Sequence, residues 1–238
     1  LKIISYVIYI TMKKTKNANV SAAIVILLLV AGIVLISGCT EVENGGGEKI
    51  QKCNLNEAIK NDWVKVERIY GVGSSSGDSI MIDVKRVVNY TLEIEIEVGR
   101  EITTSISSEQ NMAIRRIKGK PMDATRYEPA VKITLDTQEI KTYILEAYCL
   151  EFDKDNPSGQ NRFSIGGINT EIKKIFNAAD ELPDAGSIAA IQIAIWVMTD
   201  DISRQDIEEK LDISEGDIQN AKTLLETAGV DISHKRLF

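Results

Sequence analysis

The stretch IAAIQIAIWVM, residues 188–198, contains ten apolar residues and one glutamine, Gln192. It is long enough for three helical turns, and its apolar residues lie all around the helix axis, so we expect a helix that is buried on every side. Such a helix needs other elements on both of its sides, which predicts that it forms the junction between a helical layer and the rest of the fold. The carboxamide of Gln192 must find partners there, because an unpaired buried amide costs about 2 kcal/mol or more.

Around this segment, from about residue 166 onward, the apolar pattern has the period of helices. The N-cap serine and the aspartate three residues later recur at Ser203 with Asp206 and at Ser214 with Asp217, the spacing of a capping box. The sequence therefore predicts a helical subdomain over residues 166–238, with helices at 170–182, 187–201, 203–211 and 214–229.

Upstream of residue 166 the pattern is that of strands. In YTLEIEIEVG, residues 90–99, apolar residues alternate with glutamates, as in a strand with one buried face. TYILEAYCLEF, residues 142–152, is largely apolar on both faces, as in a central strand. With weaker strands at 64–72, 79–88, 111–119 and 130–137, the sequence predicts an α+β fold, in which a β-sandwich-like domain at residues 55–165 precedes the helical subdomain packed on it.

The first 38 residues resemble an export signal. A basic segment after Met12 leads into an apolar run at residues 22–36, and Ser37 and Gly38 precede Cys39. This end resembles the lipobox of prokaryotic lipoproteins, which implies cleavage before Cys39 and a lipid on its sulfur. An uncleaved membrane anchor is the alternative.

With either kind of attachment to the membrane, the remaining chain is expected on the outer face of the cytoplasmic membrane or at the cell surface. Residues 39–54 are polar and rich in glycine, and they are predicted to form a flexible tether.

The charge of the exported part argues against nucleic acid as a partner. Removal of residues 1–38 takes away four lysines and changes the formal charge from −7 to −11. Residues 203–229 have the spacing of a helix-turn-helix, but residues 203–238 contain five basic and eight acidic side chains. We therefore interpret them as a packed helical hairpin.

The sequence offers no metal, cofactor or conventional enzyme site. His234 is the only histidine, which argues against a zinc site or a histidine-based triad. DKDNPSG, residues 153–159, departs from a calcium loop because Pro157 and Ser158 stand at positions that this loop reserves for other residues. We therefore expect a protein that is not an enzyme.

Two explanations remain for Gln192. Its carboxamide can bond a backbone group of the β domain. Alternatively, the thiol of Cys149, on the predicted central strand 43 residues earlier, can displace ammonia from the carboxamide and leave an internal thioester. That reaction depends on proximity and orientation, and its product needs a site that excludes water.

Two short motifs support the second explanation. YCLE, residues 148–151, and IQIAIW, residues 191–196, resemble the thioester domains of Gram-positive surface adhesins, although Ile191 replaces the threonine of that family. The resemblance implies a thioester between Cys149 and Gln192, which an amine on a surface target opens to give a covalent attachment. It implies that Tyr148 and Trp196 shield the bond. The wider arrangement also resembles a widespread group of prokaryotic exported proteins.

Two alternatives for Cys149 stay open at this point. Outside the cell it can form a disulfide with Cys53. It can also be a core residue of a non-covalent extracellular binding module.

Overall fold

The computed structural model describes residues 38–43, 45–123, 126–160, 162–210 and 212–238. Most of the predicted export segment, residues 1–37, lies outside the described residues. Cys39, the predicted lipidation site, is described and partly exposed. Of the helices in the described part of the chain, none has the length and apolar character needed to cross a membrane. Residues 41–238 form one compact unit.

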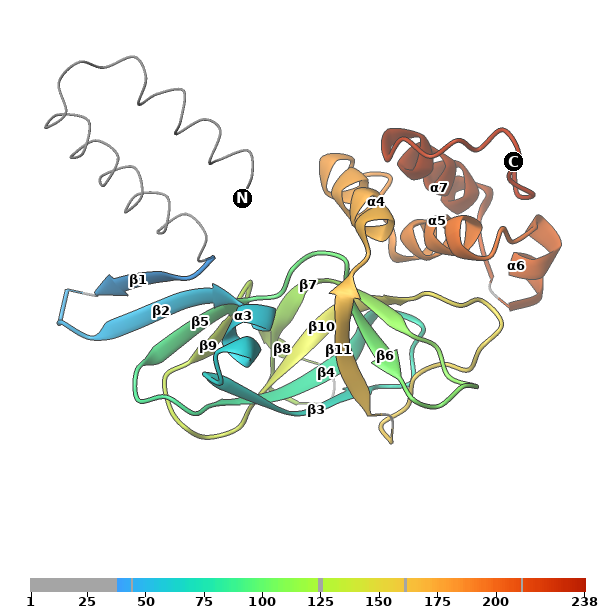
Figure 1. Cartoon of the computed structure of the whole chain (residues 1–238). Helices are drawn as coiled ribbons and strands as arrows, with labels where there is room; N and C mark the ends of the chain where they lie inside the picture. Colours follow the sequence, from blue (N-terminus) through green and yellow to red (C-terminus); the bar gives the residue numbers. More distant parts are fainter. Residues whose placement is uncertain (1–37, 44, 124–125, 161, 211) are drawn as a thin grey trace, which may run out of the picture. The chain divides into compact units, whose positions relative to one another are not determined.

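In the described chain, strands and one short helix make up the first two thirds, and helices make up the last third (Figure 1). In chain order the elements are β1 (Thr40–Glu43), β2 (Lys49–Asn54), α3 (Leu55–Lys60), β3 (Val64–Gly71), β4 (Ser76–Arg86), β5 (Thr91–Glu95), β6 (Arg100–Thr104), β7 (Met112–Pro121), β8 (Tyr127–Pro129), β9 (Ile133–Leu135), β10 (Lys141–Cys149), β11 (Phe163–Ile168), α4 (Thr170–Glu181), α5 (Ile188–Thr199), α6 (Arg204–Lys210) and α7 (Glu215–Thr227). The predicted α+β class is confirmed, with a sheet-rich part followed by helices.

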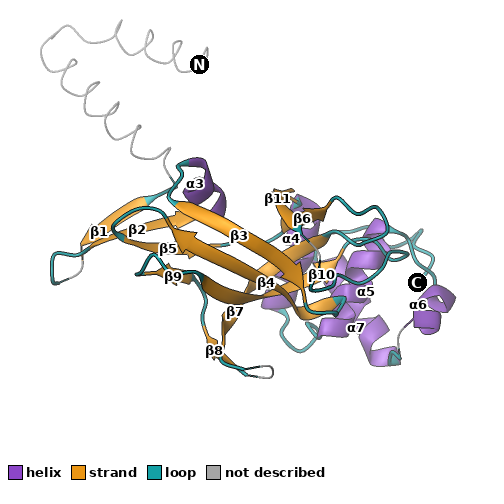
Figure 2. Ribbon diagram, turned by 90° about the horizontal axis from the view of Figure 1, so that it is seen from below, coloured by secondary structure: helices purple, strands orange, loops and turns teal. Residues whose placement is uncertain are grey.

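The strands form two sheets (Figure 2). The larger sheet is antiparallel, in the order β11-β6-β7-β10-β4-β3, and β8 is attached to β7. The smaller sheet has the order β1-β2-β5-β9, and β2 runs parallel to β5. β10 lies inside the larger sheet and is buried on both faces from Tyr143 to Cys149, as its sequence predicted for a central strand.

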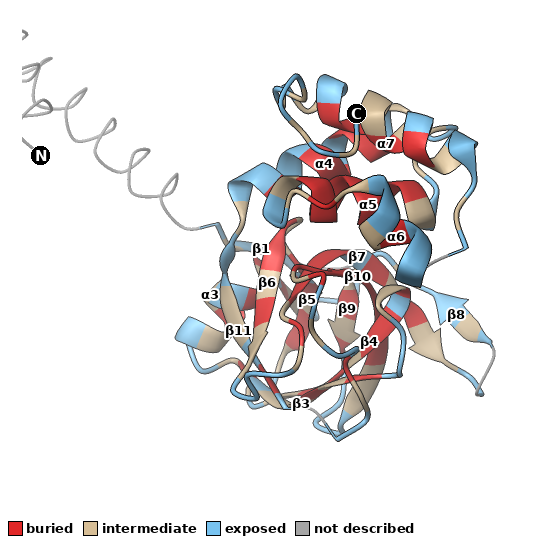
Figure 3. Cartoon of the chain, turned by 90° about the vertical axis from the view of Figure 1, so that its right-hand side faces the viewer, coloured by how far each residue is buried: buried red, intermediate tan, exposed pale blue. Residues whose placement is uncertain are grey.

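α5 is the helix that IAAIQIAIWVM predicted, and residues 190–197 are all buried. It packs against α4 and α7 within the helical layer and against β10 and β4 of the larger sheet. Figure 3 shows α5 in red between the strands and α7. Its near-continuous apolar surface follows from this position, since both sides of the helix face protein.

The prediction that residues 39–54 form a flexible tether is wrong for residues 40–43 and 49–54. Residues 40–43 form β1, which lies beside β2 in the smaller sheet. Residues 49–54 form β2, in which residues 50–54 pair with residues 91–95 of β5, and Cys53 is buried. In KIQKCN only Ile50 and Cys53 are apolar, so the alternation is too weak to identify a strand. β2 is a strand because it hydrogen-bonds to β5, whose own sequence has a clear alternation.

Local signals at the ends of the predicted helices are confirmed. Ser214 and Asp217 form a reciprocal capping box at the start of α7. Ser203 and Asp206 make the same pair of hydrogen bonds before α6. Gly229 follows α7 with φ +77°, a left-handed conformation that glycine adopts without strain.

Candidate functional site

Cys149 and Gln192 come together where the end of β10 meets α5. Cys149 is the last residue of β10 and is 0% exposed. The Ser187 hydroxyl accepts the Ala190 N–H and fixes the start of α5, which places Gln192 in the second turn, where it is 1% exposed. The two residues that the motifs singled out therefore share one buried site.

The carboxamide of Gln192 bonds the main chain of Cys149 at both ends. The Cys149 N–H donates to Gln192 Oε1 at 3.1 Å, and Gln192 Nε2 donates to the Cys149 carbonyl at 2.9 Å. Because both bonds go to one residue, the amide carbon Cδ faces the Cα that carries the thiol. The Cys149 N–H is shared with the Ser75 carbonyl, at 3.0 Å.

The thiol of Cys149 lies on the side chain of Met112, with Sγ 3.2 Å from Sδ. Met112 begins β7 and stands opposite Cys149 in the antiparallel register. Burial, together with the charge of Glu151, raises the pKa of the thiol, so it is protonated at neutral pH.

The alternative prediction of a Cys53–Cys149 disulfide is wrong for this structure. Cys149 carries a free thiol. Cys53 belongs to β2 in the smaller sheet, whereas Cys149 ends β10 in the larger one.

Tyr148 does not lie over the sulfur of Cys149. Adjacent residues of a strand point to opposite faces, and Tyr148 packs its ring against Phe176 of α4, with the ring centroids 5.4 Å apart. Its hydroxyl donates to Glu146 at 2.8 Å. Tyr148 therefore holds the end of β10 against α4.

Glu146 is the centre of a buried charged cluster that sequence reasoning missed. It accepts hydrogen bonds from Arg115 at 2.8 Å and from Arg116 at 2.7 Å, besides that from Tyr148. Burial by itself raises the pKa of Glu146, but the hydrogen bonds and the two arginine charges outweigh it, and its pKa lies below the ordinary value. A signal was available, because Glu146 faces the interior in the otherwise apolar start of TYILEAYCLEF.

Trp196, the second residue predicted to shield the bond, is buried in α5. It follows Gln192 by one helical turn, so the two side chains project from the same side of α5, and it is 2% exposed. Its ring meets that of Phe152 edge to face, with centroids 5.1 Å apart. Since Phe152 follows Cys149 by three residues, this aromatic pair joins the two motif segments.

A cavity of about 300 Å³ adjoins this aromatic pair. Residues 152–156, the loop after β10, form one wall, and Ser75, Gln110, Trp196 and Lys210 complete the lining. Lys210 holds the loop in place, because its ammonium group bonds the Phe152 carbonyl and lies 4.0 Å from the centroid of the Phe152 ring. Sequence reasoning gave no signal for Ser75, Met112 or Lys210, whose roles arise only from the fold.

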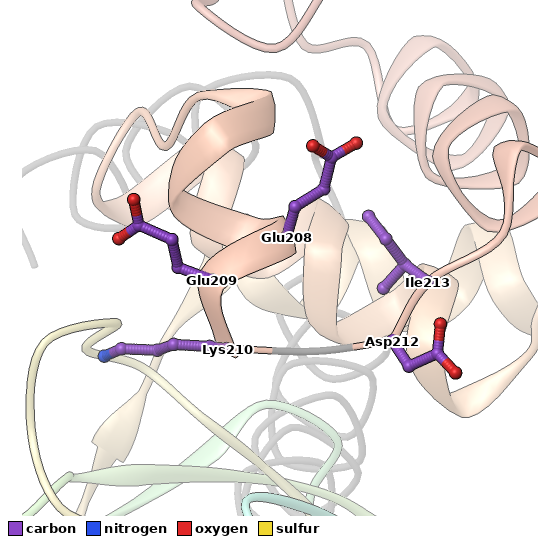
Figure 4. Close-up of a pocket in the computed structure, with 5 residues that line it drawn as sticks. All are labelled: Glu208, Glu209, Lys210, Asp212 and Ile213. Atoms are coloured by element: carbon purple, nitrogen blue, oxygen red, sulfur yellow. The ribbon is translucent and has the colours of Figure 1, made fainter.

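A second hollow, of about 480 Å³, lies at the end of α6. Its lining residues are Glu208, Glu209, Lys210, Asp212 and Ile213. Figure 4 shows that these side chains point in different directions, so they do not converge on a ligand. Within the described residues no group of three histidine, cysteine or acidic side chains is arranged to hold a metal ion.

Comparison with known proteins gives one match. Residues 146–228 match the family model of the thioester domain. No curated protein and no solved structure matches the chain. The matched segment begins three residues before Cys149 and includes Gln192 and Trp196. The match over residues 146–228 confirms the resemblance to thioester domains that the Tyr-Cys and Gln-x-Ala-Ile-Trp motifs predicted.

Proposed function

We propose that this protein is an exported, membrane-anchored surface protein that attaches covalently to an amine-bearing target through a thioester between Cys149 and Gln192. The observation that carries the proposal is the pairing of the Gln192 carboxamide with both main-chain groups of Cys149 in a buried site. The thioester-domain match over the same segment supports it.

The bond forms by exchange of nitrogen for sulfur. Sγ of Cys149 adds to Cδ of Gln192, the C–N bond breaks, and the thiol proton leaves with the nitrogen as ammonia. The raised pKa of Cys149 keeps this proton on the sulfur, where the departing nitrogen can take it up. The Cys149 N–H, already bonded to Oε1, stabilises the negative charge that develops on this oxygen.

The target opens the bond by the reverse kind of exchange. A primary amine adds to Cδ of Gln192, the C–S bond breaks, and the sulfur takes up the proton that the amine loses. The product is an amide that links Gln192 to the target, with a free thiol at Cys149. Each molecule reacts once and is not regenerated, so the protein acts as an adhesin and not as an enzyme.

A fluorescent primary amine tests the chemistry. Incubation with the purified protein is expected to label Gln192, with the label surviving denaturation and mapping to the peptide that contains this residue. Cys149→Ala and Gln192→Ala are expected to abolish labelling, whereas Cys53→Ala, a matched cysteine control, is expected to keep it. Labelling of Cys149→Ala at the wild-type level contradicts the proposal.

The anchoring is tested separately. Since Cys39 follows an apolar run and small residues, Cys39→Ser is expected to release the protein from membranes or to leave the signal uncleaved. Processing and membrane association equal to the wild type contradict the lipid anchor.

A non-covalent extracellular binding module is the second candidate. The contact of Sγ with Met112 favours it, because this is how an unreactive core thiol packs. This candidate predicts no labelling by the fluorescent amine in any variant.

A further inference from the structure

The proposed reaction takes place at the very end of a strand. Toward β4 the register of β10 ends at Tyr148, opposite Ser76, and toward β7 it ends at Cys149, opposite Met112. Strand ends fray when no other contacts take over from the hydrogen bonds of the sheet. Because the bond between the thiol and the Gln192 carboxamide depends on exact placement, the end of β10 needs a further support.

Glu151, the last residue of the YCLE motif, supplies such a support. One carboxylate oxygen accepts the main-chain N–H of Asn111 at 2.7 Å, and the other accepts the Nδ2–H of the same residue at 2.6 Å. Lys154 Nζ also donates to the carboxylate, at 3.2 Å. The Asn111 carbonyl in turn accepts the Leu150 N–H at 2.9 Å. The segment after Cys149 therefore holds both main-chain groups and the side chain of Asn111, and bonds to a charged acceptor are the stronger kind.

Asn111 connects this carboxylate to the thiol. It directly precedes Met112, which pairs with Cys149 and whose Sδ lies 3.2 Å from the Cys149 sulfur. Its Oδ1 accepts the Thr104 N–H at 3.0 Å, so the side chain of Asn111 is also held by the end of β6. Loss of the Glu151 contacts would therefore release the residue that aligns Met112 with the thiol.

We propose that Glu151 is a positioning residue of the thioester site, which fastens the start of β7 to the end of β10 and so holds the Cys149 thiol where the bond to Gln192 forms. The carboxylate neither gives nor takes a proton in the reaction, and it acts through Asn111 and Met112. This inference rests on the proposed function, because the bond whose formation Glu151 supports is the thioester itself.

The rate of bond formation in the folded chain is the measurement. The full chain is made by in vitro translation under reducing conditions, samples are quenched in acid, and intact mass spectrometry follows the loss of one ammonia. Glu151→Gln keeps the length of the side chain but turns an N–H group toward one of the two donors of Asn111. We expect this variant, shown to be folded by circular dichroism, to form the bond about tenfold more slowly than the wild type, because small displacements of reacting groups are costly in rate.

A second glutamate with the same kind of contacts provides the control. Glu57 accepts the main-chain N–H and the Nδ2–H of Asn54 at the start of α3, at 3.5 Å and 2.9 Å. Glu57→Gln thus disturbs a similar pair of hydrogen bonds outside the thioester site. It is expected to form the bond at the wild-type rate.

A reciprocal exchange tests whether the contact itself matters. Glu151→Gln combined with Asn111→Asp swaps the amide and the carboxylate, so the new amide can donate to the new carboxylate while its oxygen accepts the main-chain N–H of position 111. We expect the double variant to regain most of the wild-type rate, since the two positions act through one interaction. Should Glu151→Gln fail to fold, Glu151→Asp takes its place, because its shorter side chain cannot reach both donors, and it is expected to slow bond formation in the same way.

The possible results separate this inference from the proposed function. A Glu151→Gln variant that forms the bond as fast as the wild type overturns the positioning role. So does equal slowing in Glu57→Gln, or a double variant as slow as Glu151→Gln alone. In these three cases the wild type carries the bond, and the proposed function stands. A wild type that stays at full mass contradicts the proposed function itself and the inference that rests on it.

Discussion

Both ends of the Gln192 side-chain amide bond the main chain of a single residue, Cys149. Oε1 accepts the Cys149 N–H at 3.1 Å, and Nε2 donates to the Cys149 carbonyl at 2.9 Å. This pair joins α5 to the end of β10 and satisfies a carboxamide that would otherwise be stranded in an apolar helix. It also keeps the carboxamide of Gln192 on the main chain of Cys149, the residue of β10 that carries a buried thiol. The same contact thus serves the fold and prepares the proposed chemistry.

The contribution of this pair to the fold can be measured without the thioester. In a Cys149→Ala background, Gln192→Met keeps the side-chain length but removes both hydrogen bonds, and we expect a loss of about 1–3 kcal/mol in the free energy of unfolding. Urea denaturation gives the value. Gln219→Met, on the exposed face of α7, is the matched control and is expected to change stability by less than about 0.5 kcal/mol. Equal effects of the two substitutions would contradict a structural role for the pair.

The thiol of Cys149 should react as a buried group once the thioester is prevented. In Gln192→Met the thiol has no acyl partner, and burial still raises its pKa. A raised pKa means that less thiolate is present at any given pH. We therefore expect alkylation by iodoacetamide to keep rising at pH values where the same thiol, in the denatured chain, has reached its plateau near its ordinary pKa of about 8.5. Both samples also carry Cys53→Ala, so that Cys149 is the cysteine whose alkylation is followed within residues 41–238. Coincident pH profiles of the folded and the denatured protein would show the prediction to be wrong.

The buried charges under α4 should matter more for stability than a surface pair. Arg115 and Glu146 are both nearly inaccessible to solvent, and removal of one partner leaves the other charge buried. Arg115→Met is expected to cost about 3 kcal/mol. Arg126→Met, which breaks the exposed pair with Asp123, is expected to cost less than about 1 kcal/mol. Thermal and urea unfolding compare the two, and similar losses would contradict the assigned role of Glu146.

The same cluster predicts a loss of stability in acid. Because the pKa of Glu146 lies below its ordinary value of 4.5 in the folded protein, its contribution is fully present above pH 4.5 and is lost as the pH falls through the lowered pKa. The melting temperature is expected to fall over this range. Glu146→Gln is less stable at neutral pH but should lose less on acidification. A steeper acid loss in Glu146→Gln than in the wild type is the opposite of this expectation.

Much of the fold follows from sequence period alone. The alternation around β5 and the two-faced apolar pattern of β10 predicted strands, and the all-round apolar pattern of α5 predicted a junction helix. β1, β2, β6, β8 and β11 escaped prediction because their alternation is weak or absent. Such strands are specified by their neighbours, which supply hydrogen bonds and a buried face.

The site was predictable where a polar residue stands out against an apolar background. Gln192 in IAAIQIAIWVM is the clearest case, and Glu146 in TYILEAYCLEF offered the same signal. Tyr148, by contrast, faces α4 and not the sulfur, since a neighbour in a strand sequence points to the opposite face. Gln110 and Ser75 lie in segments with no distinguishing pattern, and only the folded chain brings them to the site.

The mass of the intact protein tests the central claim most directly. Formation of a thioester between Cys149 and Gln192 releases one ammonia, so the wild-type chain is expected to weigh one ammonia less than its sequence requires. Cys149→Ala and Gln192→Ala, processed identically at the N-terminus, are expected to show their full masses. A small amine that opens the thioester is expected to raise the mass of the wild-type protein by the mass of that amine. A wild-type protein at full mass, purified without exposure to amines and with a thiol at Cys149 that alkylates after denaturation, would contradict the thioester.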